Sequence, residues 1–129
     1  MPSLLVLFNH SMTDRQLRDA RENLGVSRIV TPPASIRTLW SSIPADADAL
    51  EPVLAPVRQW IDTTAVLGDH VLVQGDFGAT YLMVNHCLER GLVPVYATTR
   101  RRAAEELLPD GTVRLTHTFE HRRFRRYGL

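Results

Sequence analysis

The chain has 129 residues, 44% of them apolar, which suits one folded domain with its own core. No apolar run reaches the roughly 18–20 residues that span a bilayer. The N-terminal segment lacks the basic stretch of a signal peptide and is expected to form a first strand. Cys87 is the only cysteine, which excludes an internal disulfide and favours a cytoplasmic location.

Charge is distributed unevenly along the chain. Residues 1–97 hold seven arginines against ten acidic residues, whereas residues 98–129 hold eight arginines against four. All fifteen basic residues are arginine, whose planar guanidinium binds phosphate through paired hydrogen bonds and stacks on flat rings. The clustering favours a nucleotide ligand, although the lack of lysine alone equally fits a genomic composition bias.

The first half of the chain predicts two strands and three helices. Leu4–Phe8 is an apolar run typical of a central strand. Thr13 and Gln16 match a capping box at the start of a helix, and Gly25 stands where that helix would end. The other expected elements are a strand at residues 28–31, a helix at 32–43 and a helix at 52–65, which Pro56 either kinks or begins.

A strand, a glycine turn and a helix follow. Val71–Gln74 predicts a buried strand, Gly75–Gly78 a tight turn, and Ala79–Arg90 a helix that Gly91 ends. Such a turn points the free backbone N–H groups of the helix start outward, which suits a phosphate. Many turns of this kind bind nothing, so the motif is weak by itself.

The last third is rich in strand signals. Leu92–Ala97 predicts a fourth strand, while residues 101–108 fit either a short helix or a strand. Pro109-Asp110-Gly111 indicates a turn, and residues 112–118 alternate like a strand before a basic tail. With no linker to divide the chain, we expect residues 1–129 to form a single α/β domain.

The alternation of strands and helices predicts a mainly parallel sheet flanked by helices. Ligands of such sheets bind beyond the carboxyl ends of the strands. Polar clusters follow three predicted strands, and we expect them to meet at one edge: Asn9-His10-Ser11, Gln74-Gly75-Asp76 and Thr98-Thr99-Arg100.

Four segments resemble a family of small CRISPR-associated proteins of the Csx type, from type III systems: Leu7–Ser11, Val73–Thr80, Tyr96–Arg100 and His121–Tyr127. The resemblance spans nearly the whole chain and is most specific at residues 73–80. It implies a Rossmann-like fold akin to the CRISPR-associated (CARF) sensor domains, and a homodimer. The implied ligand is a cyclic oligoadenylate, above all the tetra-adenylate ring. The implied activity is cleavage of that ring, called ring nuclease activity, which ends the antiviral signal.

This chemistry places few demands on the protein, because the ribose 2′-hydroxyl beside each phosphodiester is the nucleophile. The protein must align that hydroxyl with the leaving oxygen and stabilise the charge that develops on phosphorus. Asp76 is the only carboxylate within a strand-end cluster and Cys87 stands alone. We therefore expect neither a metal nor a cofactor.

Three residues are the candidate catalytic groups. His10 is the first choice for general acid or base, since an imidazole with a pKa near about 6.5 can do either task. His121 is the second choice, and Arg100 is expected to hold a phosphate. The structural alternatives are a loop histidine bonded to backbone and a solvated surface arginine.

The candidate ligand-binding residues also have plain structural explanations. Asn9 and Ser11 would orient His10 or bond a ribose, or simply form a turn. Asp76 is better explained as a helix N-cap than as a catalytic group. The remaining candidates come from the glycine turn and the fourth strand end: Gln74, Gly75, Phe77, Gly78, Thr80, Thr98, Thr99 and Arg101. The arginines of residues 121–127 lie among aromatic residues and suit phosphate contact, or form a basic edge strand.

Three functions remain open at this point. The first is a metal-independent ring nuclease, and the second is a non-catalytic binder of the same ring, acting as a sponge or sensor. The third is a Rossmann-like mononucleotide-binding or interaction module, because the turn lacks the full G-x-G-x-x-G pattern of dinucleotide sites. The expected partners are a cyclic oligoadenylate and a second copy of the chain, with one ring across the two-fold axis. We expect no membrane and no long nucleic acid.

Overall fold

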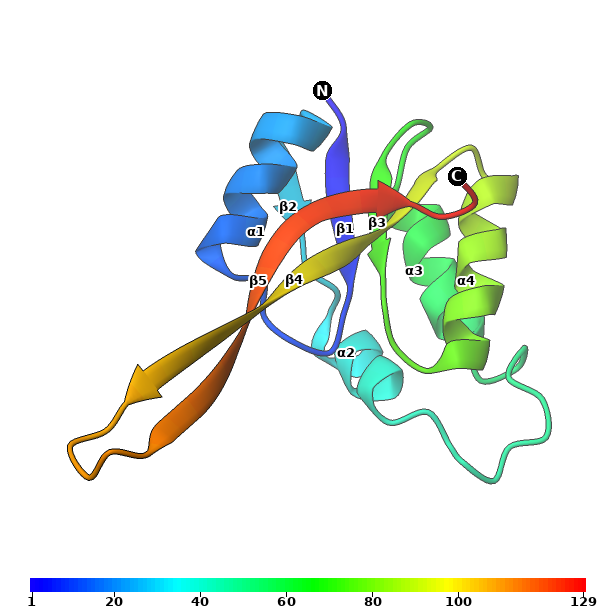
Figure 1. The fold of residues 1–129 in the computed structure, drawn as a ribbon. Helices are drawn as coiled ribbons and strands as arrows, with labels where there is room; N and C mark the ends of the chain where they lie inside the picture. Colours follow the sequence, from blue (N-terminus) through cyan, green and yellow to red (C-terminus); the bar gives the residue numbers. More distant parts are fainter.

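Five strands form one curled sheet in the order β2-β1-β3-β4-β5 in a computed structural model that describes residues 1–129 (Figure 1). Neighbouring strands from β2 to β4 run parallel, whereas β5 runs antiparallel to β4. The strands are β1 (Ser3–Leu7), β2 (Arg28–Val30), β3 (His70–Val73), β4 (Val93–Leu107) and β5 (Val113–Arg126). The prediction of a mainly parallel sheet flanked by helices is confirmed.

Helices cover the two faces of the sheet unequally (Figure 1). One face carries α2 (Ala34–Ser41), α3 (Ala55–Thr64) and α4 (Phe77–Glu89). The other carries α1 (Asp14–Asp19), which continues into a π-helical turn, η1 (Ala20–Leu24). No helix has the length and apolar character needed to cross a bilayer.

Each face has its own core. The larger core lies under α2, α3 and α4 and includes Leu5, Trp40, Ile61 and Met83, all at most 2% exposed. The smaller core lies between α1 and the sheet and includes Leu4, Leu72, Val95 and Phe124. The alternation of Leu4 and Leu5 between the two cores shows that β1 is buried on both faces, as a central parallel strand should be.

Capping residues, a glycine and a proline determine where several helices begin or end. Thr13 and Gln16 form both hydrogen bonds of the capping box, so this prediction is confirmed. Gly25 ends η1 with a φ of 69°, a left-handed conformation that glycine adopts without strain. Pro56 lies in the first turn of α3 and marks its start, because a proline there loses no helical hydrogen bond.

The fourth strand differs most from its prediction. It does not end at Ala97 but continues to Leu107, so the undecided residues 101–108 are strand. The basic tail is likewise part of β5, and a turn at residues 108–112 joins the two strands, with Gly111 at a φ of 87°. β4 and β5 thus form a long hairpin, whose outer part, residues 100–120, we call the arm. Figure 1 shows the arm projecting well beyond the body of the protein.

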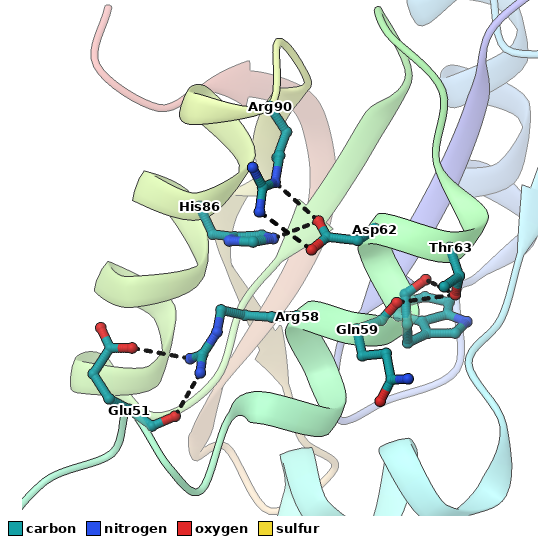
Figure 2. Close-up of polar contacts among 8 residues, drawn as sticks. Glu51, Arg58, Gln59, Asp62, Thr63, His86 and Arg90 are labelled. Atoms are coloured by element: carbon teal, nitrogen blue, oxygen red, sulfur yellow. Dashed lines mark hydrogen bonds and ion pairs between the residues drawn. The ribbon is translucent and has the colours of Figure 1, made fainter.

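Polar contacts tie α3 to α4 on the outer side of the larger core (Figure 2). The Asp62 carboxylate of α3 lies 2.8 Å from His86 Nε2 and accepts a hydrogen bond of 3.1 Å from Arg90 Nε at the C-terminal end of α4. Partial burial would raise the pKa of Asp62, but these hydrogen bonds outweigh it and hold the pKa below its ordinary value. A separate ion pair of 3.1 Å joins Arg58 to Glu51 and fixes the loop before α3.

Candidate functional site

A cleft of about 520 Å³ opens at the carboxyl ends of β1 and β2. Its walls are the loop after β1, the end of β2 and one side of α2. The cleft has an apolar floor and a polar mouth, a combination typical of small-molecule sites. The floor includes Val6, Phe8, Leu17 and Ile29, and the polar lining comprises Asn9, His10, Ser11, Thr31, Arg37, Thr38 and Ser41.

The loop after β1 supplies the predicted residues of this cleft. Asn9, His10 and Ser11 are all exposed and all line it. The His10 ring stands edge-on to the Phe8 ring, with 5.3 Å between their centroids. This contact fixes the imidazole beside the apolar floor while leaving its nitrogens open to a ligand.

Helix α2 supplies a cation that the sequence analysis missed. Ala34, Arg37, Thr38 and Ser41 follow helical spacing along one side of α2, while Ile36 and Trp40 are buried on the other. Arg37 is exposed and forms no ion pair. The sequence does contain a sign of this part of the cleft. Thr31 directly follows β2, and the polar residues of α2 come next at helical spacing.

The turn after β3 lies beside the β1 loop, as predicted, but its groups are used within the chain. The Gln74 amide N–H donates to Leu7 O at 3.0 Å, and its side-chain oxygen accepts from Ala97 N at 2.8 Å. Its backbone oxygen accepts from Trp40 Nε1 at 2.9 Å. Gln74 therefore bridges β1, β4 and α2, and does not line the cleft.

Gly75 is required by packing. A Cβ built there would lie 2.7 Å from Trp40 Nε1, which is closer than real Cβ contacts. At Gly78 the nearest atom is Leu50 Cδ1, at 3.2 Å. The two glycines thus let the turn lie against α2 and the loop before α3, and the expected approach to a phosphate is unnecessary to explain them.

At the start of α4, Asp76 has the structural role of a helix N-cap. The Asp76 carboxylate accepts from Ala79 N at 3.0 Å and caps the helix, which begins at Phe77, two residues before its predicted start. The Thr80 hydroxyl is buried and has no hydrogen-bond partner. Phe77 is 96% exposed, an unusual position for a phenyl ring, but it does not line the cleft.

The third predicted cluster leaves the edge of the sheet. Thr98 lies next to Ala97 at the edge, and its hydroxyl donates to Arg123 O at 3.0 Å. Thr99, Arg100 and Arg101 continue outward in β4, because the strand does not end where the sequence suggested. None of these residues lines the cleft. Gln74 bonds to both Leu7 and Ala97, so the three strand ends are neighbours, but only the cluster Asn9-His10-Ser11 lines the cleft.

His121 is placed away from the cleft, in the contact between β5 and α1. It is 8% exposed, and its Nε2 lies 2.6 Å from the Asp19 carboxylate. Burial would raise the pKa of Asp19, but hydrogen bonds from Asn23 and His121 outweigh it and lower the pKa. A proton carrier for the cleft would have to reach it, so His121 is better explained as a structural residue.

No group of three or more His, Cys, Asp or Glu side chains is arranged to hold a metal ion. His117 and His121 have a spacing of four, which on a helix would bring two imidazoles together. Both lie on β5, where four residues cover about 13 Å. Cys87 is buried in the larger core, and burial raises the pKa of its thiol to about 12.

A second hollow lies between η1 and β5, with a volume of about 720 Å³. Four arginines line it: Arg122, Arg123, Arg125 and Arg126. Arg125 is held by Tyr96, donating to its hydroxyl at 3.0 Å and lying 5.5 Å from its ring centroid. This arginine groove carries positive charge but lacks a histidine or hydroxyl side chain among its lining residues.

The chain matches one known family over nearly all of its length. The model of the family described as "Uncharacterized protein MJ1673 family" matches residues 2–125. A protein of Methanocaldococcus jannaschii, described as "Uncharacterized protein MJ1673", is 42% identical over 128 residues, which cover 99% of this chain and 98% of that protein. No solved structure matches. With both matches running almost from end to end, the chain belongs to the MJ1673 family.

Proposed function

We propose that this chain is a cytoplasmic ring nuclease that binds and cleaves cyclic oligoadenylate in the cleft beyond β1 and β2. The observation that carries the proposal is the composition of that cleft. It sets an open imidazole, His10, and an unpaired guanidinium, Arg37, above an apolar floor. A nucleotide offers a flat base for the floor and a phosphate for the arginine.

The fold supports this proposal. The order β2-β1-β3-β4 of parallel strands is that of doubly wound sheets, whose ligands bind beyond the carboxyl ends. We therefore interpret the body as a Rossmann-like domain related to the CARF sensors. The cleft lies on the expected edge.

The proposed reaction uses two side chains. The ribose 2′-oxygen attacks the adjacent phosphorus, and the bond from phosphorus to the 5′-oxygen breaks. The 2′-hydroxyl loses a proton and the departing 5′-oxygen gains one. His10 carries out one of these two transfers and solvent water the other, while Arg37 stabilises the charge on the phosphoryl oxygens. The products are a 2′,3′-cyclic phosphate and a 5′-hydroxyl, so no water or metal is consumed in opening the ring.

The volume of the cleft bears on how a ring would be held. About 520 Å³ lies within the range of sites for single drug-sized ligands, and a cyclic tetranucleotide is larger than these. One cleft would thus hold part of a ring. Two clefts related by a two-fold axis would match the symmetry of the whole ring.

The test is incubation of labelled cyclic tetra-adenylate with the protein in the presence of a metal chelator. We expect linear products ending in a 2′,3′-cyclic phosphate. His10→Ala should lower the cleavage rate at least about tenfold with binding kept within a few-fold, as for loss of a proton carrier. Arg37→Ala should weaken both binding and cleavage.

Two control variants outside the cleft distinguish the effect of losing a cleft residue from the general effect of losing an arginine or a histidine. Arg28→Ala removes an exposed arginine at the opposite end of β2, and His117→Ala removes an exposed histidine on the arm. Both should cleave like the unaltered protein. If the protein binds the ring but does not cleave it, its function is that of a sponge or sensor and not of a nuclease. If His10→Ala cleaves the ring at an unchanged rate, His10 is not part of the mechanism.

A further inference from the structure

The four arginines of the arginine groove form no ion pair with any carboxylate of the chain. The one acidic side chain that lines the groove is Asp19, which already lies 2.6 Å from His121 Nε2. The nearest acidic residue in β5, Glu120, is shared by Arg15 and Arg102. Four like charges close together on one strand repel one another, so their grouping calls for an anion from outside the chain.

Protection of an exposed strand edge does not explain this grouping. β5 is the last strand of the sheet, and charged side chains on such a strand discourage pairing with other chains. The segment that most needs this protection is 113–119, where Leu115 is 56% exposed and Phe119 is 69% exposed. It carries one arginine, Arg114, whose charge is already neutralised by an ion pair. The unpaired arginines gather instead at residues 122–126, beside η1.

The arginines extend over a longer distance than one phosphate group covers. Arg122 and Arg126 are four positions apart on a strand, which corresponds to about 13 Å. A guanidinium typically holds a phosphate through two parallel hydrogen bonds. The hollow of about 720 Å³ is also far larger than a single phosphate. A ligand that uses all four arginines therefore carries several phosphates in a row.

The other lining residues favour a nucleic acid strand over a plain chain of phosphates. Leu24 and Leu129 add apolar surface beside the arginines, which suits sugars and the faces of bases. Inorganic polyphosphate has no apolar part that could use this surface. The groove offers little to read the edges of bases, because the Asn23 amide donates to Asp19 and no other amide or hydroxyl side chain lines it.

We propose that the arginine groove binds the backbone of a single-stranded nucleic acid, without preference for base sequence. The guanidinium groups contact successive phosphates, and their planes can also stack on bases. Because the arginines line a hollow, the ligand must enter the protein surface, which a single strand can do more readily than a wider duplex. The sequence led us to expect no long nucleic acid, and the grouping of these arginines in one groove is the reason to expect one.

The inference does not rest on the proposed function. The groove and the cleft have no lining residue in common. The groove also lacks a histidine or hydroxyl side chain, so it should hold a strand without cleaving it. Oligodeoxythymidine is a suitable probe, because it lacks the 2′-hydroxyl that the proposed ring cleavage requires. Its binding can therefore succeed or fail independently of any activity in the cleft.

The test is fluorescence anisotropy of labelled oligodeoxythymidine of about 15 nucleotides, a length that covers the usual site sizes. Between about 50 and 200 mM salt, the logarithm of the association constant should fall with the logarithm of the salt concentration with a slope near about −2.8, since each of four phosphate contacts contributes about −0.7. Arg122→Gln combined with Arg126→Gln removes two contacts. This variant should halve the slope and weaken binding at least about tenfold at the lower salt concentration.

A second double variant controls for the loss of net charge. Arg28→Gln combined with Arg114→Gln removes two exposed arginines that do not line the groove, one of them on the same strand β5. It should bind like the unaltered chain. Thermal unfolding of both double variants should confirm that they are folded, because all four side chains are exposed.

Three results would overturn the proposal. The first is the absence of salt-dependent binding by the unaltered chain, and the second is an equal loss of affinity in the two double variants. The third is a preference for another ligand. Tighter binding of a duplex of the same length would exclude a single-strand groove, and binding of inorganic polyphosphate without binding of the oligonucleotide would assign the groove to polyphosphate.

Discussion

The missing side chain of Gly75 lets the β3–α4 turn lie against the Trp40 indole. The same glycine in the sequence suggested a phosphate site, because a glycine turn before a helix serves both purposes equally well. What decides between them is a tertiary contact with α2, 35 positions earlier in the chain. No local pattern contains that information.

We expect Gly75→Ala to lower the free energy of unfolding by about 1–3 kcal/mol, the usual cost of forcing an extra methyl group into a packed site. Its Cβ would meet the indole ring at 2.7 Å and 2.9 Å, and a ring cannot bend away as a flexible chain end can. Urea denaturation measures the difference. Gly78→Ala is the control. Its Cβ meets a flexible leucine methyl, and alanine is about 1 kcal/mol better than glycine in a helix. Equal losses at both positions would contradict this account.

His10 and Arg37 show how far residues could be assigned from sequence. His10 follows the first strand directly, so its place at the carboxyl edge was correctly predicted. Arg37 was not predicted, because only Thr31 is polar at the end of β2, before two prolines, and the helix that follows is marked mainly by its buried residues Ile36 and Trp40. The polar side of α2, with Arg37, Thr38 and Ser41 at helical spacing, was readable and would have completed the cleft.

At the scale of elements, the junction of α1 with β5 holds the root of the arm to the body. It contains the His121–Asp19 contact at 2.6 Å and an ion pair of 3.6 Å between Arg15 and Glu120. The residues it joins are about a hundred positions apart in the chain, so sequence spacing gave no hint of their pairing. His121 was for that reason assigned to catalysis.

We expect Asp19→Asn to destabilise the protein by about 1–3 kcal/mol at pH 7, since it removes a charged hydrogen-bond partner from a buried histidine. The folded state lowers the pKa of Asp19, so the ionised carboxylate contributes stability above its ordinary value of 3.8. That contribution is lost as the pH falls through the lowered value. The difference between variant and unaltered protein should therefore shrink under acid conditions.

Thermal unfolding from pH 7 down to pH 3 measures this difference. Asp14→Asn is a suitable control, because Asp14 is exposed in the first turn of the same helix and forms no ion pair. The difference in unfolding temperature between Asp19→Asn and the unaltered protein could instead stay constant across this range. That result would show that the carboxylate charge is not what stabilises the junction.

Elements with strong local signals were predicted well, and the hairpin was not. Capping residues, prolines and apolar periodicity placed most helix starts to within a few residues. The Thr98–Arg102 segment is polar and basic, which suggested a strand end with a ligand site. In the structure the same residues are paired with β5, and only long-range register with residues 118–123 could have revealed this.

At the scale of the whole molecule, the protein has three separate surfaces. The cleft lies at the carboxyl ends of β1 and β2, and the arginine groove lies between η1 and β5. The arm projects beyond the body of the protein (Figure 1). The body carries a histidine and an arginine in the cleft, whereas the arginines of the C-terminal third lie on the hairpin, four of them lining the groove.

The most direct test of the central claim is an NMR titration of the uniformly ¹⁵N-labelled chain with cyclic tetra-adenylate. His10→Ala protein should be used so that cleavage of the ring is slow during the titration. Because the ring is proposed to bind beyond β1 and β2, the amide signals of Asn9, Ser11, Thr31, Arg37 and Thr38 should shift most. Shifts confined to Arg122–Arg126 would move the ligand to the arginine groove, and no shifts at either place would contradict the proposed function.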